Sequence, residues 1–159
     1  MKDPLLFSDW LELEESWIDY NGHLNMGYYT VLFDRAADQS VQIFGFRPDY
    51  KARTGHSTFA AEFHIRYLRE VKMGSRVRAS YRIIGYDEKR WHTFQELYHE
   101  DGWLAATGEG LGLHVDLSGP RVAPMPPDVL DTFAAVHAVQ RELPLPGGIG
   151  GRIGMRKPG

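Results

Sequence analysis

The stretch SWIDYNGHLNMGYYTVLF, residues 16–33, joins an apolar run with strand character to a run with helical spacing. Between these runs lies a polar cluster of one carboxylate, one imidazole and two amides: Asp19, Asn21, His23 and Asn25. One side-chain acceptor is enough to cap the start of a helix. The excess of polar groups therefore indicates a functional site where the helix begins, with Gly22 providing a sharp turn.

The chain after this cluster is predicted to form one long helix followed by strands. Apolar residues recur at helical spacing from about Met26 to Phe44, and Gly45 is typical of a helix end. The period then changes to two, which predicts half-buried antiparallel strands in residues 57–71, 76–86, 91–100 and 103–117. An earlier strand is expected at residues 8–18, and a second helix at residues 126–143.

These elements predict an α+β domain over residues 1–143, in which an antiparallel sheet of about five strands wraps a long central helix and a C-terminal helix follows. Residues 144–159 are rich in glycine and are expected to form a flexible tail. In the strand at 76–86, Val77 and Ala79 are expected to face the core, and Ser80 and Arg82 the solvent. Glycines at 108, 110 and 112 indicate a bulge or the close approach of another backbone.

The predicted sheet has more apolar surface than one long helix can cover. The strands carry Trp91, Leu97, Tyr98 and Trp103, which suggests that the second face is not uniformly polar. A helix covers only one face of a sheet. The sequence therefore predicts a homodimer, or a dimer of dimers, formed by two-fold pairing.

Composition excludes several other classes of site. The 159 residues contain no cysteine, which removes disulfides, thiolate metal ligands and a catalytic cysteine. The net charge of −3 gives no electrostatic case for nucleic acid. No apolar run approaches the ~18 residues that span a bilayer, and the first residues do not resemble a signal peptide, so a cytoplasmic protein is expected. The scattered histidines form no metal-binding motif, and neither a metal nor a cofactor is predicted.

The segment WIDYNGHLNMGYYTVLFDRAAD, residues 17–38, resembles the active-site segment of hot-dog-fold acyl-CoA thioesterases of the 4-hydroxybenzoyl-CoA thioesterase type. In that family an Asp precedes a Gly-His-(Val/Leu)-Asn turn and a long helix. The likeness continues through FAAEFHIRYLREVKMGSRVRASYRI (59–83) and LHVDLSGPRVAPMPPDVL (113–130). Within the family, residues 16–39 are most similar to the thioesterases of bacterial carnitine degradation, which cleave betainyl-CoA to glycine betaine and CoA.

The resemblance implies hydrolysis of a short acyl-CoA thioester without cofactor or metal. By the family pattern, Asp19 acts as general base or as nucleophile, and the backbone of Met26 donates to the oxyanion. A helix start suits this role because its N–H groups are unpaired and its dipole end is positive. The alternative for Asp19 is an ordinary turn-forming or capping side chain.

The other candidate residues each have a structural alternative. His23 is either a base or an orienting group, or else a turn histidine bonded to backbone. Asn25 contacts substrate or caps the helix, and Glu62 belongs to the site or is a solvated strand charge. Trp17, Tyr28 and Tyr29 form a pocket for an aryl or quaternary ammonium acyl group, or else pack in the core.

Two further questions stay open at this level. The CoA phosphates need Arg or Lys anchors, and the candidates are Arg66, Arg69, Lys72, Lys89 and Arg90. The competing functions are a hot-dog enoyl-CoA hydratase or dehydratase and a non-catalytic acyl-CoA-binding module.

Overall fold

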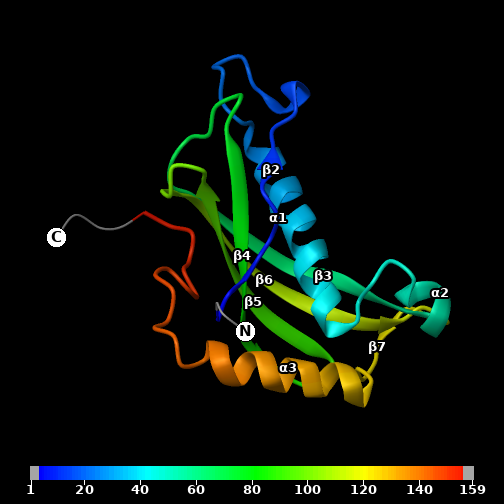
Figure 1. Ribbon diagram of the computed structural model, residues 1–159. Coiled ribbons are helices and arrows are strands. Elements are labelled where there is room, and N and C mark those ends of the chain that lie inside the picture. Colours follow the sequence, from blue (N-terminus) through cyan, green and yellow to red (C-terminus); the bar gives the residue numbers. More distant parts are fainter. Residues whose placement is uncertain (1–3, 156–159) are drawn as a thin grey trace.

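A curved antiparallel sheet wraps one long helix in the computed structural model, which describes residues 4–155 (Figure 1). The sheet has seven strands, with β1-β4-β5-β6-β3 as its main order. Short β2 also pairs with β4, and short β7 pairs with β6. The strands are β1 (Leu6–Phe7), β2 (Leu11–Glu12), β3 (His56–Tyr67), β4 (Arg76–Tyr86), β5 (Arg90–His99), β6 (Leu104–Asp116) and β7 (Arg121–Val122).

The predicted long helix is confirmed. Helix α1 (Met26–Val41) begins at Asn25, whose side chain accepts a hydrogen bond from the Gly27 N–H at 3.0 Å. A 3-10 turn, η2 (Gln42–Phe44), extends it to Gly45, which has a left-handed φ of 92°. Asn25 is therefore the N-cap that the sequence suggested, and the polar cluster lies immediately before the helix.

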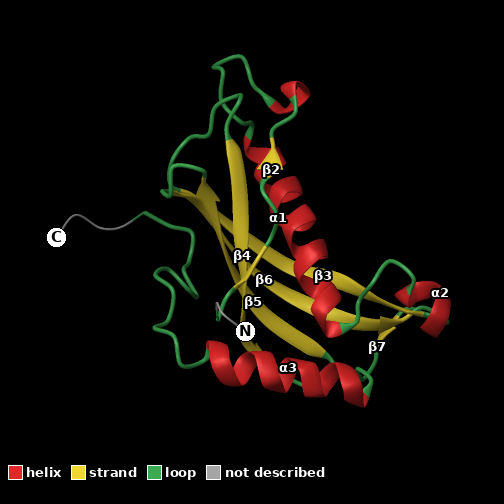
Figure 2. Cartoon of the chain, viewed as in Figure 1, coloured by secondary structure: helices red, strands yellow, loops and turns green. Residues whose placement is uncertain are grey.

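Two apolar clusters hold the helices against the sheet. In the first, α1 presents Leu32 and Phe33 to the inner face of the strands, where Val77 and Leu97 are also buried. In the second, helix α3 (Pro127–Gln140) packs on the other end of the sheet, where it crosses the strands (Figure 2). Trp91 and Leu97 are thus buried within the chain itself, because β5 turns both toward the helices. The sequence argument for a partner subunit used these two residues, but their burial needs no partner.

One local prediction is wrong, and one short helix was missed. The strand expected at 8–18 is only the two-residue β2 followed by a 3-10 turn, η1 (Glu15–Trp17). The chain leaves the sheet there because the Trp17 N–H pairs with the Glu14 carbonyl, as in a turn. The short helix α2 (Tyr50–Thr54) was not predicted, and it ends at Gly55 in the left-handed region. Five residues are too few for helical periodicity to be read from sequence.

The glycines of β6 make room for aromatic rings. A methyl group at Gly110 would lie 3.0 Å from the Phe63 ring, and one at Gly112 would lie 2.3 Å from the Trp91 ring. The sequence predicted a bulge or the close approach of another backbone at these glycines, but the groups that approach them are side chains. The missing side chains therefore leave room for these rings against β6.

Ser80 and Arg82 were expected to face solvent, yet both are buried. The Arg82 guanidinium donates to the carbonyl oxygens of Gln140, Leu143 and Pro144 at 2.9, 2.8 and 2.6 Å. The chain after α3 therefore wraps onto the outer face of β4 and covers these positions. The alternation of apolar and polar residues in β4 cannot predict burial by the chain after α3, which is about 60 residues away in sequence.

Gln140 connects α3 to β4 through hydrogen bonds, and replacing it is expected to destabilise the fold strongly. Its side chain is fully buried, accepts from the Ile83 N–H at 2.7 Å and donates to the Tyr81 carbonyl at 3.2 Å. Gln140→Met keeps the length but leaves two buried backbone groups unpaired, so we expect the free energy of unfolding to fall by about 2–5 kcal/mol. Denaturant titration measures this. Gln42→Met, at an exposed helical site, is the matched control, and equal effects in both variants would contradict the anchoring role.

The chain after α3 lies on the side of the strands away from α1, coloured orange to red in Figure 1. The Gly150 N–H donates to both carboxylate oxygens of Glu109, at 3.1 and 2.8 Å. The flexibility expected for residues 144–159 stays a prediction, and residues 156–159 lie outside the described part. Within residues 4–155, no helix has the length and apolar character needed to cross a bilayer.

Candidate active site

A cleft of about 360 Å³ opens at the start of α1. One wall is the loop that leads into the helix, and the other is the end of β3 with the turn that follows. Four predicted site residues meet there: Asp19, His23, Met26 and Tyr29. The remaining wall consists of Leu24, Tyr67, Leu68, Arg69 and Glu70.

Asp19 uses one carboxylate oxygen for the turn and keeps the other free. Oδ1 accepts from the N–H groups of Asn21 at 2.8 Å and His23 at 3.2 Å. Oδ2 has no hydrogen-bond partner within residues 4–155. The turn-forming role weighed for Asp19 is therefore present, and it fixes the carboxylate while a second oxygen stays available in the cleft. Gly22 allows this turn with a φ of 79°.

The first N–H of α1 is also available. The Gly27 N–H is capped by the Asn25 side chain at 3.0 Å, and the Tyr28 N–H donates to the Asn25 carbonyl at 3.0 Å. Among the described residues the Met26 N–H has no acceptor. Since Met26 and Asp19 line the same cleft, an unpaired donor at the positive end of the helix dipole accompanies the carboxylate.

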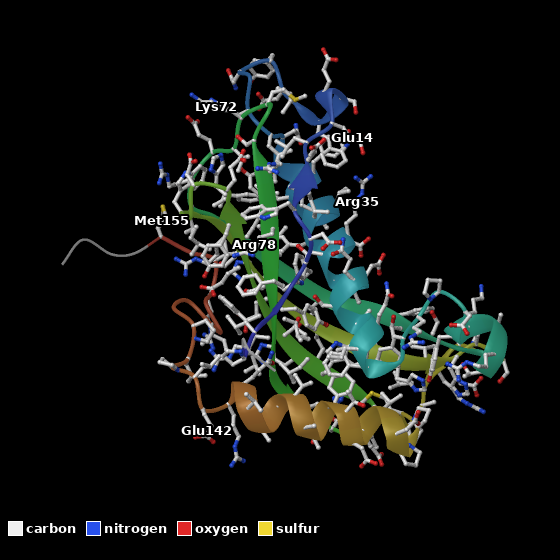
Figure 3. The ribbon with its side chains drawn as sticks, in the orientation of Figure 1. Glu14, Arg35, Lys72, Arg78, Glu142 and Met155 are labelled. Carbon is white, nitrogen blue, oxygen red and sulfur yellow. The ribbon has the colours of Figure 1, made fainter. Side chains whose placement is uncertain are left out.

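His23 pairs with a carboxylate that sequence reasoning missed. Its Nε2 lies 3.1 Å from Oε2 of Glu70, whereas only its backbone groups reach Asp19: the His23 N–H donates to Oδ1, and the His23 carbonyl accepts from the Asp19 N–H at 2.9 Å. Backbone pairing holds the two segments together, because His23 forms a β-bridge with Lys72 and the Leu24 N–H donates to the Val71 carbonyl at 2.8 Å. Figure 3 shows Lys72 at the same end of the molecule as this loop.

Two tyrosine rings form the apolar part of the cleft. Tyr29 and Tyr67 meet edge to face with centroids 5.1 Å apart. The Tyr67 hydroxyl donates to the Met26 carbonyl at 3.2 Å, which ties β3 to the helix start. Burial raises the pKa of Tyr29, so this hydroxyl stays neutral and donates to the Arg69 carbonyl at 3.4 Å. Tyr67 and Glu70 belong to the segment YLRE, residues 67–70, which lies within the 59–83 stretch that resembles the thioesterase family. That likeness was the signal that could have pointed to them.

Trp17 and Tyr28 do not line this cleft. Their rings stack on each other with centroids 5.4 Å apart, and the Arg35 guanidinium lies 4.7 Å from the Trp17 ring. Arg35 is held there by Glu14 at 3.0 Å, and Figure 3 shows the two side chains facing each other. This aromatic pair thus already has a cation from the chain itself.

A second cavity of about 250 Å³ lies between α1 and the inner face of the sheet, and Glu62 is found here. It shares no lining residue with the Asp19 cleft. Its walls come from α1 between Thr30 and Val41 and from strands β3 to β6.

The candidate phosphate anchors differ in their availability. Lys89 and Arg90 form ion pairs with Glu88 and Asp87. Arg69 lies over the Trp103 ring at 4.1 Å. Arg66 and Lys72 form no ion pair within residues 4–155, so they remain the freest of the five. No group of three or more His, Asp or Glu residues in that range is arranged to hold a metal ion.

Relatives of known name match nearly the whole chain. A betainyl-CoA thioesterase of Pseudomonas aeruginosa is 39% identical over 140 residues, which are 87% of this chain and 88% of the relative. An L-carnitine dehydrogenase/betainyl-CoA thioesterase of Agrobacterium fabrum is 40% identical over 137 residues, 86% of this chain. The chain spans only 28% of that longer protein.

Solved structures share the fold. A Pseudomonas putida KT2440 protein superposes with a TM-score of 0.83 and 29% identity, covering 98% of this chain and 99% of that one. A Staphylococcus aureus protein solved in complex with CoA has a TM-score of 0.88 and 24% identity, covering 96% of each chain, which shows the fold alone. Residues 14–133 match the family described as the thioesterase-like superfamily. The predicted resemblance is confirmed: the chain belongs to the thioesterase-like superfamily and has its hot-dog fold.

Proposed function

We propose that this hot-dog thioesterase hydrolyses betainyl-CoA to glycine betaine and CoA. The substrate follows from the names of the relatives, of which the Pseudomonas aeruginosa enzyme matches over 88% of its own length. The observation that carries the chemistry is the meeting of the Asp19 carboxylate and the unpaired Met26 N–H in one cleft. A cytoplasmic location is part of the same proposal.

Hydrolysis uses both groups at once. The thioester carbonyl oxygen accepts a hydrogen bond from the Met26 N–H, whose donor strength is increased by the helix dipole as the oxyanion forms. Asp19 either removes a proton from the attacking water or attacks the carbonyl carbon itself. In both cases the C–S bond breaks and CoA leaves as the thiolate. In the base route Asp19 then passes its proton to the thiolate or to solvent. In the nucleophilic route water hydrolyses the acyl–Asp19 anhydride, which releases glycine betaine and restores the carboxylate. The backbone bonds to Oδ1 keep the carboxylate oriented in the cleft.

The other cleft residues position these groups. His23 and Glu70 connect the loop before α1 to the turn after β3, so their pairing holds the cleft at a fixed width. Tyr29 lies on the wall, where it contacts the substrate, and Asn25 acts through the helix cap rather than through substrate. Trp17 and Tyr28 support the start of α1 from outside the cleft.

A homodimer forms through β3 in this proposal. Within residues 4–155, β3 is the last strand of the sheet order, so one of its edges is unpaired. Its central residues Phe59, Ala60, Ala61 and Glu62 are exposed. Antiparallel two-fold pairing of β3 with its copy would cover this edge and join two sheets into one. A dimer of dimers is the larger assembly that the sequence analysis left open.

A thiol-release assay over betainyl-CoA, acetyl-CoA, benzoyl-CoA and a long-chain acyl-CoA tests the function. We expect betainyl-CoA to have the highest kcat/KM, because the site belongs to a family with betainyl-CoA thioesterases. Loss of enoyl absorbance with crotonyl-CoA, without thiol release from any ester, would instead support the hydratase alternative. Saturable binding of CoA esters without turnover would support a binding module.

A further inference from the structure

The cavity between α1 and the sheet combines acidic and aromatic side chains without any basic residue. Three carboxylates line it, and no Lys, Arg or His does. The carboxylates are Asp34, Asp38 and Glu62. Within residues 4–155 none of the three carboxylate groups forms an ion pair or accepts a hydrogen bond, and Asp38 accepts only through its backbone carbonyl, from Gln42. The cavity is therefore a region of uncompensated negative charge.

Aromatic rings form much of the remaining wall. Phe33, Phe63 and Trp91 are accompanied by Phe59 and Tyr81. Four of these rings are held in place in two pairs. Phe33 meets Phe63 edge to face at 5.5 Å, and the Trp91 Nε1–H donates to the Tyr81 hydroxyl at 3.0 Å. Rigid aromatic rings beside carboxylates attract a quaternary ammonium group, since the ring faces are negative and the methyl groups need no hydrogen-bond donor.

A buried amide gives a second, independent indication of a ligand. Gln95 lines the cavity and is only 3% exposed, yet its Oε1 has no hydrogen-bond partner within the described chain. Buried polar atoms are normally paired. An unpaired amide oxygen on a residue of the wall adds the negative end of a dipole near the cavity, which suits a cation better than an apolar acyl chain. The volume of about 250 Å³ also lies below the ~300–1,000 Å³ typical of sites for larger ligands.

Two of the carboxylates, Asp34 and Asp38, interact one turn apart on α1. Partial burial, with the charge of Asp34, raises the pKa of Asp38. A bound cation would offset the repulsion between the two carboxylates and stabilise the ionised form of both.

We infer that this cavity binds the trimethylammonium group of the acyl chain and selects betainyl-CoA over neutral esters. This inference rests on the proposed function. Asp34, Asp38 and Glu62 supply the charge, and the rings with Gln95 supply the contact surface. Trp17 and Tyr28 do not bind the ammonium group, because the Arg35 guanidinium already lies over the Trp17 ring.

The cavity of one subunit holds the ammonium group of a thioester whose carbonyl reacts in the cleft of the neighbouring subunit. Asp34 lies eight residues beyond Met26, about 12 Å along the helix. Betainyl has one methylene between carbonyl carbon and nitrogen, so a thioester bound at Met26 cannot reach the cavity of its own chain. The start of β3 lines the cavity and its end lines the cleft. Antiparallel pairing of β3 with its copy therefore brings the cavity beside the partner subunit's Asp19.

A pair of isosteric substrates tests the selection. In 3,3-dimethylbutyryl-CoA a tert-butyl group replaces trimethylammonium with the same shape and no charge. We expect the wild-type ratio of kcat/KM for betainyl-CoA over this ester to fall at least ~10-fold in the Asp34→Asn/Asp38→Asn variant, because the lost attraction is electrostatic. Gln95→Leu should lower the ratio less. Asp131→Asn, an exposed carboxylate on α3, is the control and should keep the wild-type ratio.

The outcomes separate the two proposals. In one outcome the wild type cleaves betainyl-CoA while the double variant keeps the wild-type kcat/KM ratio of the two esters. That result overturns the cation site and leaves the proposed function standing. Wild type that ignores betainyl-CoA yet cleaves other esters overturns the proposed function. Calorimetry with tetramethylammonium then still tests the cavity, and equal binding by wild type and the double variant overturns the inference.

Mixed dimers test the contribution of the partner. When an Asp19→Asn chain pairs with an Asp34→Asn/Asp38→Asn chain, one of the two shared sites keeps both the carboxylate and the intact cavity. We expect this hybrid to recover about half of the wild-type turnover of betainyl-CoA, which neither homodimer reaches. A hybrid with no more activity than the average of the two homodimers overturns the shared site.

Discussion

Asp19→Asn is expected to lower kcat for betainyl-CoA hydrolysis at least ~100-fold while the protein stays folded. The amide is isosteric with the carboxylate, and its oxygen can still accept the Asn21 and His23 N–H groups that hold the turn. What the variant loses is the negative charge and the basic oxygen. Turnover measured by thiol release, with the thermal unfolding midpoint of the same preparation, separates chemistry from folding.

The matched control for this variant is Asp131→Asn, which removes the same charge from the outside of α3. It should leave both kcat and the unfolding midpoint at wild-type values. If Asp19→Asn keeps more than about a tenth of the wild-type kcat, loss of a general base or nucleophile is ruled out, because such groups contribute about 10²–10⁴-fold. The carboxylate would then be a turn-forming residue only.

The local part of this site was readable from sequence. Asn25 as N-cap, Gly22 as the turn glycine and Asp19 beside the helix start all follow from residues within one short segment. Glu70 and Tyr67 were missed because they reach the cleft from the end of β3, over 40 residues away in sequence. Such contacts depend on how the strand packs against the helix, which no local pattern specifies.

The fold shows the same division. Helical spacing predicted α1 correctly, and period-two alternation predicted strands β3 to β6. Alternation did not tell which apolar strand residues face the helices, so Trp91 was assigned to an uncovered face although the chain buries it. Arg82 is buried by carbonyls at the end of α3 and just after it, an arrangement that depends on tertiary packing alone.

Gly112→Ala is expected to destabilise the fold by about 3 kcal/mol, at the upper end of overpacking effects. The new methyl carbon would lie 2.3, 2.5 and 2.7 Å from three atoms of the Trp91 ring. That ring cannot retreat easily, because Phe46 stacks on it with centroids 5.5 Å apart and its Nε1–H is bonded to Tyr81. The thermal unfolding midpoint should fall by roughly 10 °C.

Gly119→Ala is the control, since a methyl group there would meet no atom within 4 Å and should leave the midpoint unchanged. A second readout identifies the cause. Trp91→Phe shortens the ring, so adding it to Gly112→Ala should cost less than the sum of the two single changes, as expected for residues in direct contact. Additive losses would mean that Gly112 is required for a reason other than the ring, and the steric argument for the glycines of β6 would fail.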